Sequence, residues 1–165
     1  MAPAILVARP NHLSRRCVNV QGRILYRKPA VCSDESRLGT LVQESDITER
    51  FERGIREFNG GDYYASHDTW EDVWMDVRGS ERPFFQGMIQ VAVGFYHLTC
   101  ENYAGAEHLL TRGIRKLEAY SPGHRGVDTR RLVGEAATAL AEVLEVRAGK
   151  RKAYSSAIAP RIRRA

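Results

Sequence analysis

The sequence predicts an all-α protein, a compact bundle of about five helices built from two helical hairpins, with flexible basic tails at both ends. Three observations support this fold class. Apolar residues recur at helical spacing from Asp46 onward, breaks rich in Gly, Pro and Asn divide the chain into pieces of helix length, and a short motif repeats 40 residues apart. Because the chain has 165 residues and 43% hydrophobic content, one domain with its own core is expected.

The first expected hairpin begins with a helix that starts at Asp46. Four large apolar residues follow one another at spacings of four, four and three, which places them on one helical face: Ile47, Phe51, Ile55 and Phe58. The helix should end at residues 59–61, Asn-Gly-Gly, because these residues tolerate a positive φ. A second helix should then run from Tyr63 to about Val77, with Asp62 as its N-cap.

The second expected hairpin begins near Pro83, a residue that a first helical turn accepts, and its first helix continues to about Cys100. This helix is apolar on most sides, so we expect it to be the central one. Two further helices should span about residues 103–120 and 128–146. The pair Asn102-Tyr103 opens the first of these as Asp62-Tyr63 opens its counterpart in the first hairpin, so the chain is expected to contain two related helical hairpins.

The charge of the chain is unevenly distributed over three expected parts. These are a flexible N-terminal extension (1–44), a helical domain (45–149) and a basic C-terminal tail (150–165). The formal net charge is +5 for the whole chain, but it is −5 over residues 46–149 and +6 over residues 150–165. An acidic folded part argues against a specific reader of nucleic acid and leaves only non-specific contacts by the basic tails.

Other function classes are disfavoured by simple patterns. No apolar run approaches the roughly 20 residues of a membrane helix, so we expect a cytoplasmic protein with no membrane partner. The three cysteines lack the spacing of a zinc site or a disulfide framework. The motifs GxSxG, GxxxxGK[ST] and GxGxxG are absent, so no catalytic class is indicated.

Several spaced motifs between about residues 51 and 120 point to a family. They are Phe58-Asn59 with Gly61, His67 with Trp70, Glu71 and Trp74, Phe85-Gln86-Gly87 with Gln90, Tyr96-His97, and Asn102 with Gly105-Ala106. Together they closely resemble the domain-of-unknown-function 309 family of small all-helical proteins. The departures are Asp68, where the family more usually has Glu, and Glu101, where a Gly commonly precedes the asparagine. The resemblance implies a helical fold and implies no activity.

A candidate site lies in the stretch HDTWEDVW, residues 67–74. Offsets of 0, 3, 4 and 7 place four residues on one face of a helix: His67, Trp70, Glu71 and Trp74. A face with two indoles should be buried, and the third helix offers a polar line to meet it: Gln86, Gln90 and His97. Asp68 is expected to point away from this face. If the two faces meet, five polar side chains form one interior cluster: His67, Glu71, Gln86, Gln90 and His97. Buried polar groups of this kind must be hydrogen-bonded to one another or bind a ligand.

The cluster has two interpretations. We favour a mainly structural network that fixes how the hairpins dock, in a binding or interaction module for an unidentified small ligand or protein partner. The alternative is a metal-dependent or acid/base enzyme that uses His67, Glu71 and His97, because two imidazoles and a carboxylate are ligand types for Zn or Fe. The spacing is not HExxH, and the sequence names no cofactor.

Overall fold

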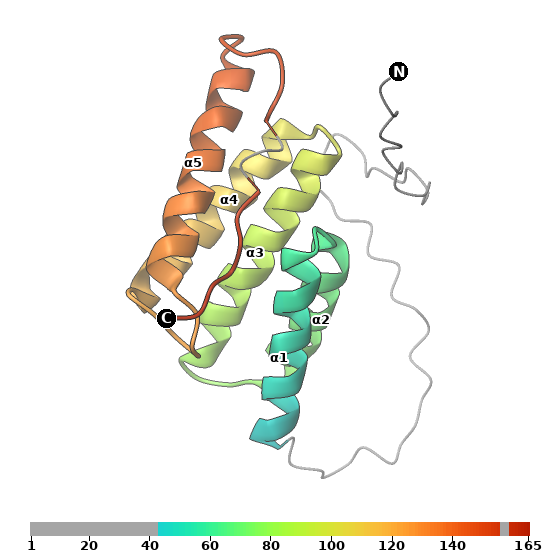
Figure 1. Cartoon of the computed structure of the whole chain (residues 1–165), viewed down its shortest axis with the longest axis vertical. Coiled ribbons are helices and arrows are strands. Elements are labelled where there is room, and N and C mark those ends of the chain that lie inside the picture. The colour runs from blue at the N-terminus through green and yellow to red at the C-terminus, as the bar shows by residue number, and fades with distance from the viewer. Residues whose placement is uncertain (1–42, 156–158) are drawn as a thin grey trace, which may run out of the picture. The chain divides into compact units, whose positions relative to one another are not determined.

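The structure is a computed structural model that describes residues 43–155 and 159–165, and all of these described residues belong to one compact unit. It confirms the all-α class and the five helices (Figure 1). They are α1 (Glu44–Asn59), α2 (Tyr63–Asp76), α3 (Glu81–Thr99), α4 (Tyr103–Leu117) and α5 (Thr129–Arg147), with a short 3₁₀ helix, η2 (Glu118–Tyr120), after α4. The expected N-terminal extension lies outside the described residues, apart from its last two positions.

Each helix packs chiefly against helices that neighbour it in the sequence. The α1/α2 and α3/α4 pairs form the two hairpins, and α5 packs on α4. Helix α3 is the most buried element, with eleven buried residues, as its apolar sequence predicts. Within the described part of the chain, none of the helices is both long and apolar enough to cross a membrane.

The two hairpin corners have the same geometry. Asp62 caps α2 by accepting a hydrogen bond from the Ala65 amide at 3.1 Å, and Asn102 caps α4 by accepting one from the Gly105 amide at 3.0 Å. The residue before each cap has a positive φ, 84° at Gly61 and 56° at Glu101. The repeated motif in the sequence therefore encodes a repeated corner.

A close helix contact holds the first hairpin together. Trp70 of α2 is fully buried and its indole N–H donates to the Phe51 carbonyl of α1 at 3.3 Å. A Cβ atom built on Gly54 would lie only 2.2 Å from the indole nitrogen. The glycine therefore makes room for the ring, and α1 can approach α2 only because this position has no side chain.

The C-terminal segment, residues 159–165, is not the free basic tail that the sequence suggested. Ile162 is only 5% exposed, the Asp128 amide donates to the Arg163 carbonyl at 2.9 Å, and the Ala165 amide donates to the Gly126 carbonyl at 3.1 Å. The segment lacks helical periodicity because it is extended, and bundle residues satisfy its backbone groups. It joins the C-terminal end of α1 to the loop before α5 (Figure 1).

Candidate functional site

The structure places the four residues of the predicted α2 face at different depths. Trp70 is fully buried and His67 is 4% exposed, whereas Glu71 and Trp74 are half-buried at the edge of the core. The guanidinium of Arg82 lies over the Trp74 ring, 3.9 Å from its centre. The inner half of the face is thus packed, and the half that bears Glu71 reaches solvent.

His67 is held in one orientation by its own helix. Its Nδ1 lies 2.9 Å from the Tyr64 carbonyl oxygen, and its ring packs against the Tyr64 ring at a centroid distance of 5.1 Å. A carbonyl oxygen can only accept, so Nδ1 must carry the hydrogen. In the neutral ring the lone pair is then on Nε2, which lies 3.9 Å from a carboxylate oxygen of Glu71.

Asp68 belongs to this group, although the helical offsets suggested otherwise. Its carboxylate lies 3.3 Å from His67 Nδ1. Burial raises the pKa of Asp68; the charge of His67 opposes that shift, and the nearby carboxylates Glu71, Asp72 and Glu57 add to it. Ligand atoms of His67, Asp68 and Glu71 all lie within 4.8 Å of one another. This trio is compact, negatively charged and accessible from the side of its two carboxylates.

His97 is occupied at the α3/α4 corner. Its Nδ1 lies 3.1 Å from the side-chain nitrogen of Asn102, the residue that caps α4, and its ring packs closely on Gly105. Burial lowers the pKa of His97. His97 is not part of the compact trio that surrounds His67.

The two glutamines of the predicted polar line are both half-buried on α3. The side-chain oxygen of Gln90 is shielded from solvent and has no hydrogen-bond partner among the described residues. Such an unpaired buried oxygen is uncommon in folded proteins. The structure therefore brings His67 and Glu71 together, adds Asp68 to them, and gives His97 a separate partner.

A second candidate site, which the sequence did not indicate, surrounds the C-terminal segment. The side chain of Asn59, at the end of α1, accepts a hydrogen bond from the Ile162 amide at 2.8 Å and donates one to the Ile162 carbonyl at 2.9 Å. A carboxylate of α5, Glu135, accepts from the Arg161 amide at 3.0 Å. We call the set of α1 and α5 side chains that contact the C-terminal segment the α1/α5 groove, after Asn59 and Glu135.

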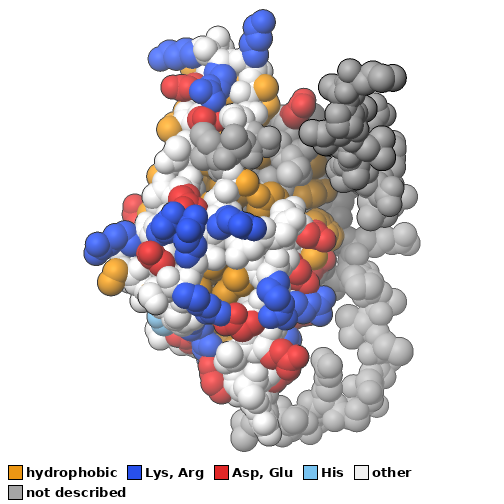
Figure 2. Space-filling model, in the orientation of Figure 1, with side chains coloured by type: hydrophobic (Ala, Val, Ile, Leu, Met, Phe, Trp, Pro, Cys, Tyr) orange, Lys and Arg blue, Asp and Glu red, His pale blue; other side chains and the backbone are white. Residues whose placement is uncertain are grey.

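Charged side chains accompany the groove. Glu52 of α1 pairs with Arg164, and Glu142 of α5 pairs with Arg151, at 2.8 Å in the second case. On the face of the molecule drawn in Figure 2, Lys and Arg side chains lie interspersed with Asp and Glu side chains. Carboxylates of α1 and α5 thus pair with basic side chains that follow α5 in the chain.

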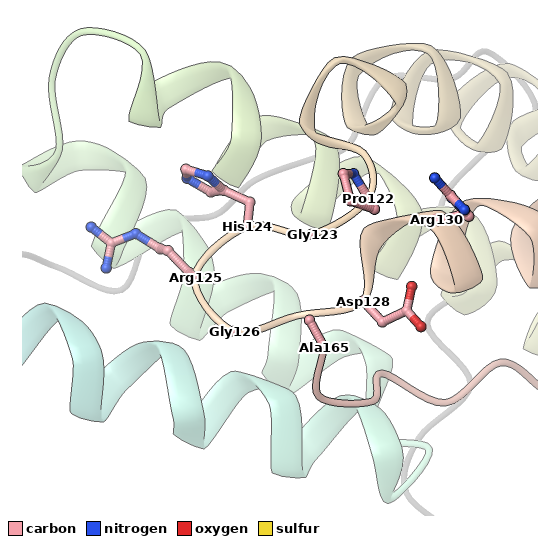
Figure 3. A pocket seen from close by; sticks show the side chains of 8 residues that line it. All are labelled: Pro122, Gly123, His124, Arg125, Gly126, Asp128, Arg130 and Ala165. Carbon is pink, nitrogen blue, oxygen red and sulfur yellow. The ribbon is translucent and has the colours of Figure 1, made fainter.

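An open hollow of about 670 Å³ lies where the C-terminal segment ends (Figure 3). Its walls come from the loop before α5, the start of α5 and the last residue: Pro122, Gly123, His124, Arg125, Gly126, Asp128, Arg130 and Ala165. Arg125 pairs with Glu44 of α1 at 2.8 Å and also with Glu81 of α3, which accepts a hydrogen bond from His124 at 2.9 Å. This network fixes the loop that forms one end of the groove.

Comparison with known proteins supports the resemblance seen in the sequence. Residues 51–109 match the model of a domain of unknown function, DUF309. The chain is also 37% identical over 68 residues to the uncharacterized protein YpuF of Bacillus subtilis. That match covers 41% of this chain and 37% of the relative, so well under half of each protein is aligned. Residues 51–109, the part of this chain that is similar to the DUF309 model, include the α2 trio and the α3/α4 corner.

Proposed function

We propose that this chain is a binding module whose α1/α5 groove takes up an extended peptide with basic and apolar residues. The observation that carries the proposal is the pair of hydrogen bonds between Asn59 and the two backbone groups of Ile162. One amide side chain thereby satisfies both the N–H and the C=O of one residue in the segment. Such a contact reads an extended backbone and tolerates many side chains.

The side chains of the C-terminal segment indicate which peptides the groove prefers. The Ile162 side chain is almost fully buried, so an apolar residue is favoured at that position. Arg164 pairs with Glu52, so a basic residue is favoured two positions later. A partner with an apolar residue between basic residues, as in Arg161-Ile162-Arg163-Arg164, would satisfy the same contacts.

The C-terminal segment competes with any partner peptide for the α1/α5 groove. Because it is tethered to the bundle, its effective concentration is on the order of millimolar. A second peptide must therefore bind tightly or find the segment released. Replacing Ile162 removes the buried anchor of the segment while leaving Asn59 and the carboxylates in place.

A labelled peptide with the sequence of residues 159–165 tests the proposal by fluorescence anisotropy. We expect saturable binding to the full chain with Ile162→Ala, at least tenfold tighter than binding to the unaltered chain. Adding Asn59→Ala should remove that gain, because the backbone contacts are lost. The control peptide carries Asp in place of the isoleucine and should not bind. A folded Ile162→Ala protein that binds neither peptide would refute the groove as a recognition site.

The enzyme alternative fits the geometry less well. It requires His67, Glu71 and His97 to act at one point, whereas His97 pairs with Asn102 at the α3/α4 corner. In our proposal His97 has a structural role, because its contacts with Asn102 and Gly105 fix the start of α4. The buried ring of His67 likewise helps to fix α2 through Tyr64.

A further inference from the structure

The C-terminal segment is bound by residues that lie far from it in the sequence. Three bundle side chains that bind it are 26, 103 and 112 residues away from their partners in the segment: Glu135, Asn59 and Glu52. None of these contacts depends on the chain connection between α5 and the segment. The same contacts are therefore available to an identical segment supplied by another molecule.

The chain returns to its own bundle through a tight turn after α5. Gly149 has a φ of 71°, its amide donates to the Val146 carbonyl at 3.0 Å, and the Lys150 amide donates to the Glu145 carbonyl at 2.9 Å. In this arrangement, a Schellman motif, a residue with a positive φ ends the helix and changes the direction of the chain. We call residues 148–150 the α5 turn. Beyond it, the C-terminal segment runs back along the bundle (Figure 1).

Apart from Gly149, the residues around the α5 turn favour a helix. Ala148 and residues 150–153, Lys-Arg-Lys-Ala, are good helix formers, whereas glycine is one of the poorest. A change of backbone conformation at Gly149 would therefore allow α5 to continue. The residues that follow would then project away from their own bundle and toward a neighbouring molecule.

From these observations we propose that the partner of the α1/α5 groove is a second copy of this chain, and that two copies exchange their C-terminal segments. This inference rests on the peptide-binding function proposed above and names the peptide. In the exchanged dimer each groove holds residues 161–164 of the other copy, so the buried Ile162 and the pair between Arg164 and Glu52 are kept. Exchange of an identical element is a low-cost route to a dimer, because it requires no new interface.

The linker after α5 sets the balance between monomer and exchanged dimer, because the groove contacts are the same in both. In the monomer, Glu142 of α5 holds the linker by pairing with Arg151 at 2.8 Å and by accepting a hydrogen bond from the Ser155 amide at 3.2 Å. The tethered segment also has an effective concentration on the order of millimolar. We therefore expect the monomer to predominate in dilute solution and the dimer to grow as the protein concentration approaches that value.

Gly149→Ala tests the role of the α5 turn. A Cβ atom at this position would meet nothing within 4 Å, so the substitution acts only on the backbone conformation. Alanine is strained at a positive φ and favoured in a helix, so the dimerisation constant, measured by sedimentation equilibrium, should rise at least fivefold. Glu142→Ala, which releases the linker without changing the turn, should also raise it.

The matched control is Gly79→Ala. Gly79 also has a positive φ, 60°, and open space around its Cβ position, but it lies between α2 and α3. The same strain is therefore introduced away from the linker, and the dimerisation constant should not change. Thermal melts establish that each variant is folded.

A mixture of two complementary full-length variants tests the exchange itself. A chain with Ile162→Asp keeps its groove but lacks the apolar anchor of its segment. A chain with Asn59→Ala and Glu52→Ala keeps its segment but has a weakened groove. Each variant alone should remain monomeric, whereas the mixture should form a heterodimer.

Two results would overturn the inference. One is a protein that stays monomeric up to millimolar concentration, with or without Gly149→Ala. The other is a mixture of the complementary variants that forms no heterodimer, which would mean that any dimer of the unaltered chain uses another surface. The labelled peptide of residues 159–165 separates these failures from a failure of the proposed function. If the peptide binds to the Ile162→Ala chain and no dimer forms, the groove binds peptides but does not take up the segment of a second copy.

Discussion

At the scale of single residues, the two hairpin corners show one geometry built from different amino acids. The position before the cap is Gly61 in the first corner and Glu101 in the second, and both have a positive φ. A residue with a side chain is strained in this region by about 1 kcal/mol, whereas glycine is not. A glycine at position 101 would remove this strain.

We expect Glu101→Gly to stabilise the protein by about 0.5–1 kcal/mol, because the strain at φ 56° disappears. The matched change Gly61→Ala, at φ 84°, should destabilise it by about 1 kcal/mol. Chemical denaturation of the two variants measures both effects. The changes in unfolding free energy should have opposite signs at the two corners. A loss of stability in Glu101→Gly would contradict the strain argument.

His97 gives the fold a dependence on pH. Because burial lowers its pKa, the folded protein holds the ring neutral at pH values where the unfolded chain, with a pKa of about 6.5, takes up a proton. Its contribution to stability is therefore fully present above that value, and is lost as pH falls toward the lower folded pKa. His97→Gln should show a smaller loss of unfolding free energy between pH 7.5 and 5.5 than the unaltered chain.

The control for this prediction is His108→Gln, because His108 is exposed on α4. It should retain the pH dependence of the unaltered protein in the same denaturation series. If both variants have the same pH slope, the burial of His97 does not govern the effect.

Local residue patterns predicted some features of the candidate site and missed others. The cap at Asp62 and the burial of Trp70 follow from helix chemistry and helical spacing, which depend on near neighbours. Helical offsets did not predict the contact between Asp68 and His67, because they do not account for a carboxylate that reaches back over the helix surface. They did not predict the role of Asn59 either, since its partner Ile162 lies 103 residues away.

At the scale of elements, the α1/α2 contact is set by one missing side chain. Gly54 faces the indole of Trp70, which is itself packed between Phe51 and Phe58. The Trp70 ring cannot move without disturbing Phe51 and Phe58. The separation of α1 and α2 is therefore determined by the missing side chain at Gly54. Sequence periodicity identified the faces that meet, but it could not show how closely they approach.

Gly54→Ala should destabilise the protein by about 1–3 kcal/mol, because the added methyl group overlaps a rigid buried ring. Gly134→Ala on α5 is the matched control, since its Cβ would meet nothing within 4 Å. There the gain in helix propensity should stabilise the fold by about 0.5–1 kcal/mol. Thermal unfolding compares the two, and a neutral Gly54→Ala would show that α1 and α2 can separate freely.

At the scale of the whole molecule, the helix order was predictable because each helix packs on its neighbour in sequence. Such contacts need only a periodic face and a turn, and both are visible in the chain. The C-terminal segment was not predictable for the opposite reason. Its partners are Asn59, residues 126–128 and Glu135, and no periodic pattern marks an extended segment that pairs with side chains.

The way the C-terminal segment is held also allows the rate of its detachment to be measured by hydrogen exchange. The amide hydrogens of Arg161 and Ile162 donate to the side chains of Glu135 and Asn59, and not to a carbonyl of a helix or sheet ladder. They can therefore exchange with deuterium whenever the segment detaches, while the amides of α3 exchange only on wider unfolding. Asn59→Ala should speed exchange at residues 161 and 162 and leave α3 unchanged. In the unaltered protein, the frequency of detachment measured at these two amides is then the fastest rate at which another peptide can enter the groove.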